Sequence, residues 1–327
     1  EKLSAILFAA LGLVLSFGLY GFLAGLVIGN IICLGYCVWI LFKKNRELVF
    51  KPEFKEIGKL LKGALPFLVA DIFIIIYFRL SSVMIMFITG SETEVGLFNS
   101  SYRLIEMYMA LPMLLVTPVY PFLSRMFTQK REECLMVAEK IMKILLIIAL
   151  PLTAIVFTDY IRINEFLFSS QYLAGAEGLR VIILAVIPLS VNVLLGTILA
   201  AIGRQKEAAI SVGISAGINL ILNYFLINSF RYIGASFTVL VSEWIITILY
   251  LYYVLRYFGK FSLTLFLSRL LVIGVLTGLI NYFVLISKTG VIPALIVSGT
   301  IYIFMLFVSG LVKFSHFSDY YKLLKEK

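Results

Sequence analysis

The chain has 327 residues, of which 61% are apolar and 14% are charged, and its mean hydropathy is +1.04. An average soluble domain is about half apolar and roughly a quarter charged, so this composition excludes a soluble globular protein. The net charge is +10, which basic loops beside anionic lipid headgroups explain, so we expect membrane lipids and not nucleic acid as partners.

The apolar residues form blocks of about 20, the length at which a helix crosses roughly 30 Å of hydrocarbon. The expected spans are Leu3–Gly18, Gly21–Leu41, Gly63–Ile88, Val95–Leu123, Ile141–Phe157, Leu179–Ile202, Ala208–Ile227, Ala235–Tyr257, Leu263–Ile286 and Val291–Val312. Long runs without period-2 alternation favour helices over a closed barrel. We therefore predict an all-α integral membrane protein with about ten transmembrane helices.

The lysines and arginines in the connections and at the ends of these spans are distributed unequally between the two sides. One set of connections holds 21 of them, and the opposite set holds only Arg162, Arg180, Arg231 and Lys288. Because basic loops stay in the cytoplasm, we predict a multi-pass protein of the cytoplasmic membrane with both ends of this chain cytoplasmic. The chain opens at Glu1 with a first block that is short for a span, so we also expect further helices upstream.

Residues that usually carry catalysis or bind metals are scarce. Cys33 and Cys37 lie one helical turn apart in an apolar span, Cys134 lies in a predicted loop, and His316 is the only histidine. The GxSxG pattern at 213–217 lies within an apolar span, where small residues serve close helix packing. We therefore expect no enzyme activity, no metal and no cofactor.

Ionisable residues within the predicted spans are the informative exceptions, because charge at membrane depth normally faces a protein interior or a water-filled pathway. They are Asp71, Arg79, Arg103, Glu106, Glu243 and Arg269. Buried pairs that hold helices together are the alternative, and Arg269 lies near a helix end, where an arginine reaches the membrane surface.

Helix geometry places two of these arginines at similar depth. Arg79 lies about 24 Å from the cytoplasmic start of its span, and Arg103 about 12 Å from the external start of the next. Glu106 is one turn from Arg103, so it is able to pair with Arg103 or with Arg79. Two arginines with one acid leave positive potential for an anion, because a guanidinium binds phosphate or carboxylate through paired donors.

Polar side chains in the spans are candidates to line the same cavity, although interhelical hydrogen bonding explains each of them equally well. They are Asn99, Tyr102, Asn192, Asn219, Asn223 and Asn281. The candidate substrate-binding set is Arg79, Arg103, Glu106, Asp71, Tyr102 and Asn99.

A family resemblance is carried by residues 60–127. The pattern of the known family has there a "LPF" start, a "YxRxD" helix, a "VGLYxxAYRL" helix start and a "PxLSR" exit. The matching positions are Pro66, Tyr77, Arg79, Val95–Leu97, Tyr102–Leu104 and Pro121–Arg125. Further elements, "YxxxAxxLR", "ALGR" and "NLxLNxxLI", are matched by Tyr172–Arg180, Ala201–Arg204 and Asn219–Ile227. The chain resembles polysaccharide biosynthesis flippases of the multidrug/oligosaccharidyl-lipid/polysaccharide exporter superfamily.

The resemblance implies a two-lobe helical transporter that moves a polyprenyl-diphosphate-linked oligosaccharide to the external leaflet by alternating access. Arg79 and Arg103 would then line a cationic central cavity. The acid of the "YxRxD" pattern is replaced by Ser81, so no carboxylate role carries over there. A polysaccharide assembly machinery is a further expected partner.

The implied organisation has five parts. They are the last two helices of an N-terminal lobe (1–42), a basic cytoplasmic linker with an amphipathic helix (43–62), a six-helix C-terminal lobe (63–258), an added helix pair (259–312) and a basic cytoplasmic tail (313–327).

Two other functions stay open. A peptidoglycan-precursor flippase or a cation-coupled drug exporter belongs to the same superfamily, but a drug exporter is expected to have an acidic cavity. A membrane glycan polymerase or ligase usually has a long external catalytic loop, and no external loop here is much longer than about 20 residues.

Overall fold

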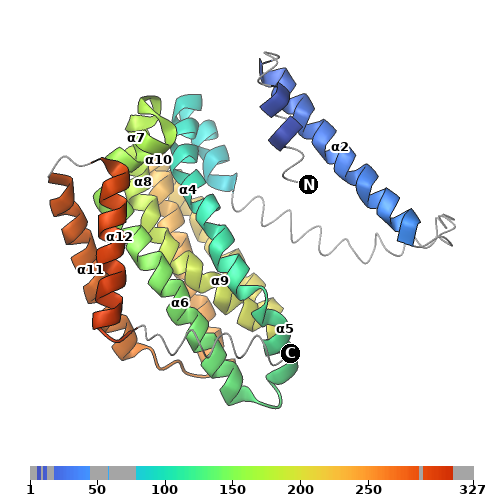
Figure 1. The fold of residues 1–327 in the computed structure, drawn as a ribbon, viewed down its shortest axis with the longest axis vertical. Coiled ribbons are helices and arrows are strands. Elements are labelled where there is room, and N and C mark those ends of the chain that lie inside the picture. The colour runs from blue at the N-terminus through green and yellow to red at the C-terminus, as the bar shows by residue number, and fades with distance from the viewer. Residues whose placement is uncertain are drawn as a thin grey trace. The chain divides into compact units, whose positions relative to one another are not determined.

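A computed structural model of the protein describes residues 6–8, 10–12, 18–44, 58, 79–286 and 290–311. The chain divides into two compact units, Glu1–Asp71 and Ile72–Lys327. Every regular element in the described ranges is a helix (Figure 1). The predicted all-α class is confirmed.

The first unit contains the long helix α2 (Gly18–Lys44), which covers the predicted span Gly21–Leu41. Most of the predicted span Leu3–Gly18 and of the linker 43–62 lies outside the described residues, as does the tail 313–327.

The second unit begins, in its described part, with a helical hairpin. Helix Arg79–Thr89 is followed by α4 (Glu92–Val116). Gly90 has φ +61°, which glycine adopts without steric cost, and Ser91 caps α4 by accepting from the Glu94 backbone N–H at 3.3 Å. The predicted span Gly63–Ile88 is described only from Arg79 onward.

The predicted span Val95–Leu123 is bent. α4 ends at Val116, and the short α5 (Val119–Met126) continues at 41° to it. Pro118 stands between them, and its missing N–H and its ring prevent a straight continuation.

The middle of the second unit runs through one long helix and a set of shorter elements. They are α6 (Arg131–Thr158), α7 (Tyr160–Phe168), η1 (Ser170–Gly175), α8 (Ala176–Ile182), η2 (Ile183–Ala185) and α9 (Val186–Ala201). α6 begins ten residues before the predicted span Ile141–Phe157. Hydropathy did not detect these first turns, because they carry charged residues. α9 packs against α10, α6 and α4, so it is the central helix.

α10 (Gln205–Tyr257) is a hairpin of two arms, because Arg231 interrupts it with φ 50° and ψ −132°. Ser215 Oγ donates to the Ser242 carbonyl oxygen at 2.8 Å, and Asn219 Nδ2 donates to Ser242 Oγ at 2.8 Å, so the arms lie antiparallel. The two arms correspond to the predicted spans Ala208–Ile227 and Ala235–Tyr257.

The last two helices are α11 (Thr264–Ile286) and α12 (Val291–Val308), which pack on each other and on α6 (Figure 1). They match the predicted spans Leu263–Ile286 and Val291–Val312. Among the described residues, six helices are long and apolar enough to cross a membrane, or seven when α4 and α5 form one span. The multi-pass prediction is confirmed.

The tip of the α10 hairpin depends on one small residue. A Cβ at Gly234 would lie 2.1 Å from the Leu226 carbonyl oxygen, whereas a Cβ at Gly217 of the same helix meets nothing within 4 Å. The clash involves backbone, so a rotamer change does not relieve it.

We therefore expect Gly234→Ala to destabilise the protein by about 2–3 kcal/mol, because the two arms must separate. The apparent melting temperature of the detergent-solubilised full-length protein measures this. Gly217→Ala is the matched control and is expected to melt like the unaltered protein. Equal melting of both variants would contradict the close approach at the tip.

Candidate functional site

The structure brings together two predicted arginines and the predicted acid. Glu106 Oε1 lies 3.4 Å from Arg79 Nη2, and Glu106 Oε2 accepts from Arg103 Nη1 at 3.1 Å. One carboxylate thus joins helix Arg79–Thr89 to a turn of α4. The arginine side chains are 57% and 65% exposed, whereas that of Glu106 is 30% exposed.

The trio lies about three helical turns from the hairpin turn at Gly90. Arg79 and Arg103 are each 11 residues from the flanking Gly90 and Glu92, so each lies about 16 Å along its helix. That is roughly half of the hydrocarbon thickness. Charge at this depth requires a partner or access to water.

The other predicted site residues are distributed unevenly. Asn99 Oδ1 accepts from Ser82 Oγ at 2.8 Å, which links the same two helices closer to the hairpin turn. Tyr102 is buried, and its ring stacks on that of Phe98 with centroids 5.6 Å apart, so its side chain belongs to the core. Asp71 lies outside the described residues.

Two members of the trio, Arg103 and Glu106, lie on a stripe of α4 that continues toward a groove. Arg103, Glu106, Ala110, Met113 and Thr117 follow each other at spacings of three and four, and none of them is buried. The stripe ends in a groove of about 570 Å³ at the bend between α4 and α5. α9 forms the opposite wall of this groove, which is lined by Met113, Thr117, Tyr120, Pro121, Asn192, Val193, Gly196, Thr197 and Ala200.

A buried polar network lies behind this groove. Asn192 Nδ2 donates to the Glu243 carbonyl oxygen at 3.0 Å and to Glu243 Oε2 at 2.9 Å, while Asn192 Oδ1 accepts from Thr247 Oγ1 at 2.8 Å. All three side chains are buried. Asn192 therefore fixes the Glu243 carboxylate against α9.

A second network joins helix Arg79–Thr89 to α10. Asn223 Nδ2 donates to Ser81 Oγ at 3.1 Å and to Asn219 Oδ1 at 2.8 Å, and Asn219 in turn contacts Ser242. Ser81, which stands where the family pattern has an acid, is thus a buried hydrogen-bonding residue. For Asn192, Asn219 and Asn223 the structure shows interhelical hydrogen bonding, which was one of the two interpretations of the sequence.

Removal of the Asn192 amide is expected to cost about 1–3 kcal/mol, because Asn192→Ala deprives buried groups of Glu243 and Thr247 of a partner. Thermal unfolding of the full-length protein in detergent measures the loss. Asn228→Ala is the control, since Asn228 is exposed and its Nδ2 donates to the Tyr224 carbonyl oxygen of its own helix. If the two variants melt alike, Asn192 does not stabilise the network.

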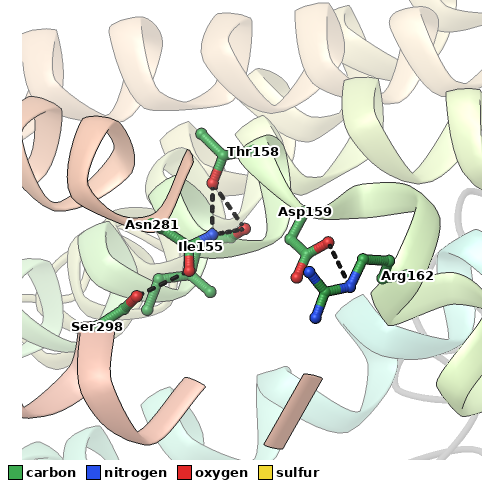
Figure 2. A network of polar contacts seen from close by, with 6 residues as sticks. All are labelled: Ile155, Thr158, Asp159, Arg162, Asn281 and Ser298. Atoms are coloured by element: carbon green, nitrogen blue, oxygen red, sulfur yellow. Dashed lines mark hydrogen bonds and ion pairs between the residues drawn. The ribbon is translucent and has the colours of Figure 1, made fainter. Parts of the chain in front are cut away.

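A third polar network attaches α11 and α12 to the end of α6. Asn281 Nδ2 donates to Thr158 Oγ1 at 2.8 Å, and Asn281 Oδ1 accepts from Ser298 Oγ at 2.7 Å. Figure 2 shows Asn281 between these two partners, with Asp159 and Arg162 facing one another on the adjoining turn.

Asp159 in this region is a buried acid that forms a long ion pair. Its Oδ1 lies 3.7 Å from Arg162 Nε, and its Oδ2 has no hydrogen-bond partner. Burial raises the pKa of this carboxyl group, and the positive charge of Arg162 opposes the shift. Because the folded-state pKa exceeds the unfolded value, the folded protein binds the proton more tightly.

It follows that Asp159 favours the folded state below its unfolded pKa of about 4, and that this contribution is lost as pH rises through the higher folded pKa. Asp159→Asn is expected to raise the melting temperature at neutral pH and to flatten its dependence on pH from about 4 to 7. Melting curves of both proteins over this range measure the effect. A steeper fall of stability with pH in the variant would refute it.

Within the ranges that the structure describes, no group of three or more His, Cys, Asp or Glu residues is placed to hold a metal ion. The arrangement therefore offers cationic donors on an exposed helix face and hydrogen-bonded amides behind it.

Comparison with known proteins gives three findings. A family described as "Polysaccharide biosynthesis protein" matches residues 1–127. "Probable low-salt glycan biosynthesis flippase Agl15" of Haloferax volcanii is 26% identical over 268 residues, which are 80% of this chain and 54% of that protein. The solved structure "Lipid II flippase MurJ, inward closed conformation" aligns with a TM-score of 0.73 and 15% identity, over 95% of this chain and 67% of that chain.

These findings support a polysaccharide biosynthesis and flippase family. The resemblance that the sequence motifs indicated is thereby confirmed. Both of these proteins are named as flippases. The chain spans about half the length of the curated relative it matches.

Proposed function

We propose that the chain is part of a membrane flippase that moves a polyprenyl-diphosphate-linked oligosaccharide from the cytoplasmic to the external leaflet for surface polysaccharide synthesis. The observation that carries this proposal is the exposed pair Arg79 and Arg103, which share the single acid Glu106. The matching polysaccharide biosynthesis family and the glycan flippase among the similar proteins support a substrate that carries a glycan.

The charge balance of the site suits a diphosphate. Two guanidiniums and one carboxylate leave one net positive charge about 16 Å from the hairpin turn. Both arginine side chains are more than half exposed, so donors that Glu106 does not engage are accessible for paired hydrogen bonds to phosphate oxygens. Asp71 remains part of the proposed site by sequence alone, and Tyr102 supports the wall from within the core.

The proposed organisation assigns 1–42 to an N-terminal lobe, 43–62 to a cytoplasmic linker, 63–258 to a six-helix lobe, 259–312 to an added pair and 313–327 to a tail. In this arrangement the stripe on α4 and the groove beside α9 form the part of the transport cavity wall that belongs to the six-helix lobe. The excess of basic residues on one side supports cytoplasmic ends in a cytoplasmic membrane. Polysaccharide assembly proteins are the partners proposed to supply or consume the substrate.

A peptidoglycan-precursor flippase is the second candidate, favoured by the fold shared with the lipid II flippase. Both candidates transport a lipid-linked diphosphate, so the arginine pair suits either. A drug exporter is disfavoured, because the exposed charges of the described site are mainly positive.

The decisive experiment replaces Arg79 and Arg103 singly with Ala and with Lys in the full-length gene, in a strain lacking its own copy. We expect the Ala variants to lower the rate of glycan delivery to the surface about ten- to hundredfold, because each removes charge-assisted hydrogen bonds. Lys is expected to rescue part of the loss, since it keeps the charge without the paired donors. Surface glycan and membrane protein level are measured together.

Arg269→Ala serves as the control, because Arg269 is an exposed arginine on α11 outside the site. Its removal is expected to leave export unchanged. Normal export from both site Ala variants, at normal protein level, would overturn the assignment of the arginines to the substrate path.

A further inference from the structure

The two carboxylate oxygens of Glu106 contact different arginines. Each carboxylate oxygen serves a guanidinium from a different helix, Oε1 for Arg79 and Oε2 for Arg103. Glu106 is the least exposed member of the trio. The acid therefore sits between the arginines, while they reach outward past it.

The two guanidiniums are only partly used by this contact. A guanidinium has five N–H donors, and the ion pairs here engage Nη2 of Arg79 and Nη1 of Arg103. An incoming diphosphate would offer stronger acceptors and more charge than one carboxylate. Binding it beside Glu106 would instead place like charges together, which is unfavourable.

We propose that Glu106 is the resident counter-ion of the arginine pair and that the substrate's diphosphate displaces it. This inference rests on the proposed function and adds to it that Glu106 and the diphosphate alternate as partners of the arginines. Glu106 neutralises part of the site when it is empty, and its return to the arginines promotes release of the product. A permanently neutral residue at 106 would hold the anion too tightly to release it at the normal rate.

The same exchange changes the link between two helices. Glu106 and the Ser82–Asn99 hydrogen bond are side-chain links between helix Arg79–Thr89 and α4. When substrate binding breaks the Glu106 link, the Ser82–Asn99 hydrogen bond nearer the hairpin turn remains. The ends of the two helices that are remote from Gly90 are then freer to separate. A ligand shifts a conformational equilibrium through such a difference in contacts between two states.

The test uses the full-length protein purified in detergent, with farnesyl diphosphate as the probe. For Glu106→Gln we expect the Kd to fall about three- to tenfold, because the competing charge is gone. Dissociation of the probe, started by excess inorganic pyrophosphate, is expected to slow by a similar factor, and glycan export in cells is expected to fall although binding is tighter. A residue with only a structural role would not combine tighter binding with slower export.

Glu133→Gln is the matched control, because Glu133 forms the same i,i+3 pair with Lys130, at 2.8 Å, outside the site. It is expected to change neither the Kd nor export. Glu106→Ala is the second variant, so that poor folding of one does not end the test, and it is expected to tighten binding as well. Unchanged or weaker binding by both Glu106 variants, with melting temperatures like that of the control, would overturn the exchange.

Arg79→Ala and Arg103→Ala separate this inference from the proposed function. If they lose the probe while the Glu106 variants fail to bind it more tightly, only the counter-ion role is wrong. If both bind the probe like the unaltered protein, no anion site exists at the pair, and the proposed cationic cavity is refuted with it.

Discussion

Hydrocarbon offers no hydrogen bonds, so every polar group of a membrane helix must find its partner inside the protein or in a water-filled space. Most buried polar side chains of the described helices obey this constraint through a neighbouring helix. Asn192 serves Glu243 and Thr247, Asn219 serves Ser242, and Asn281 serves Thr158 and Ser298. These contacts help to determine which helices are neighbours, because each amide needs a partner on the adjacent helix at the same depth in the membrane.

The same constraint makes Arg79 and Arg103 stand out. They are charged, lie about 16 Å from the hairpin turn and remain more than half exposed. Arginine is poorly suited to face lipid at that depth. The physical consequence is that the helix faces that carry them border water or an anion. The groove at the α4–α5 bend extends the face of α4 that carries Arg103.

The sequence predicted the helical class and most spans well, because hydropathy over about 20 residues reports directly on helix length in a membrane. It also predicted that Glu106 is able to pair with Arg103 or Arg79, and the structure shows both contacts. The bend at Pro118 and the early start of α6 were not predicted from the sequence, since neither changes the apolar pattern that defines a span. Whether an asparagine lines a cavity or joins two helices depends on which helices are neighbours, and that is a tertiary property.

Ser81 departs from the family pattern, and the structure shows what its side chain does instead. By sequence it only removes an acid that the family pattern often has there. In the fold its hydroxyl accepts from Asn223, which binds Asn219, so helix Arg79–Thr89 is joined to α10 without a charge. In the second unit, Glu106 is then the one acid in contact with Arg79 and Arg103 among the described residues. A site with a single shared acid is sensitive to any anion that competes for its arginines. The proposed transport of a diphosphate requires this sensitivity, because the site must both bind its substrate and release it.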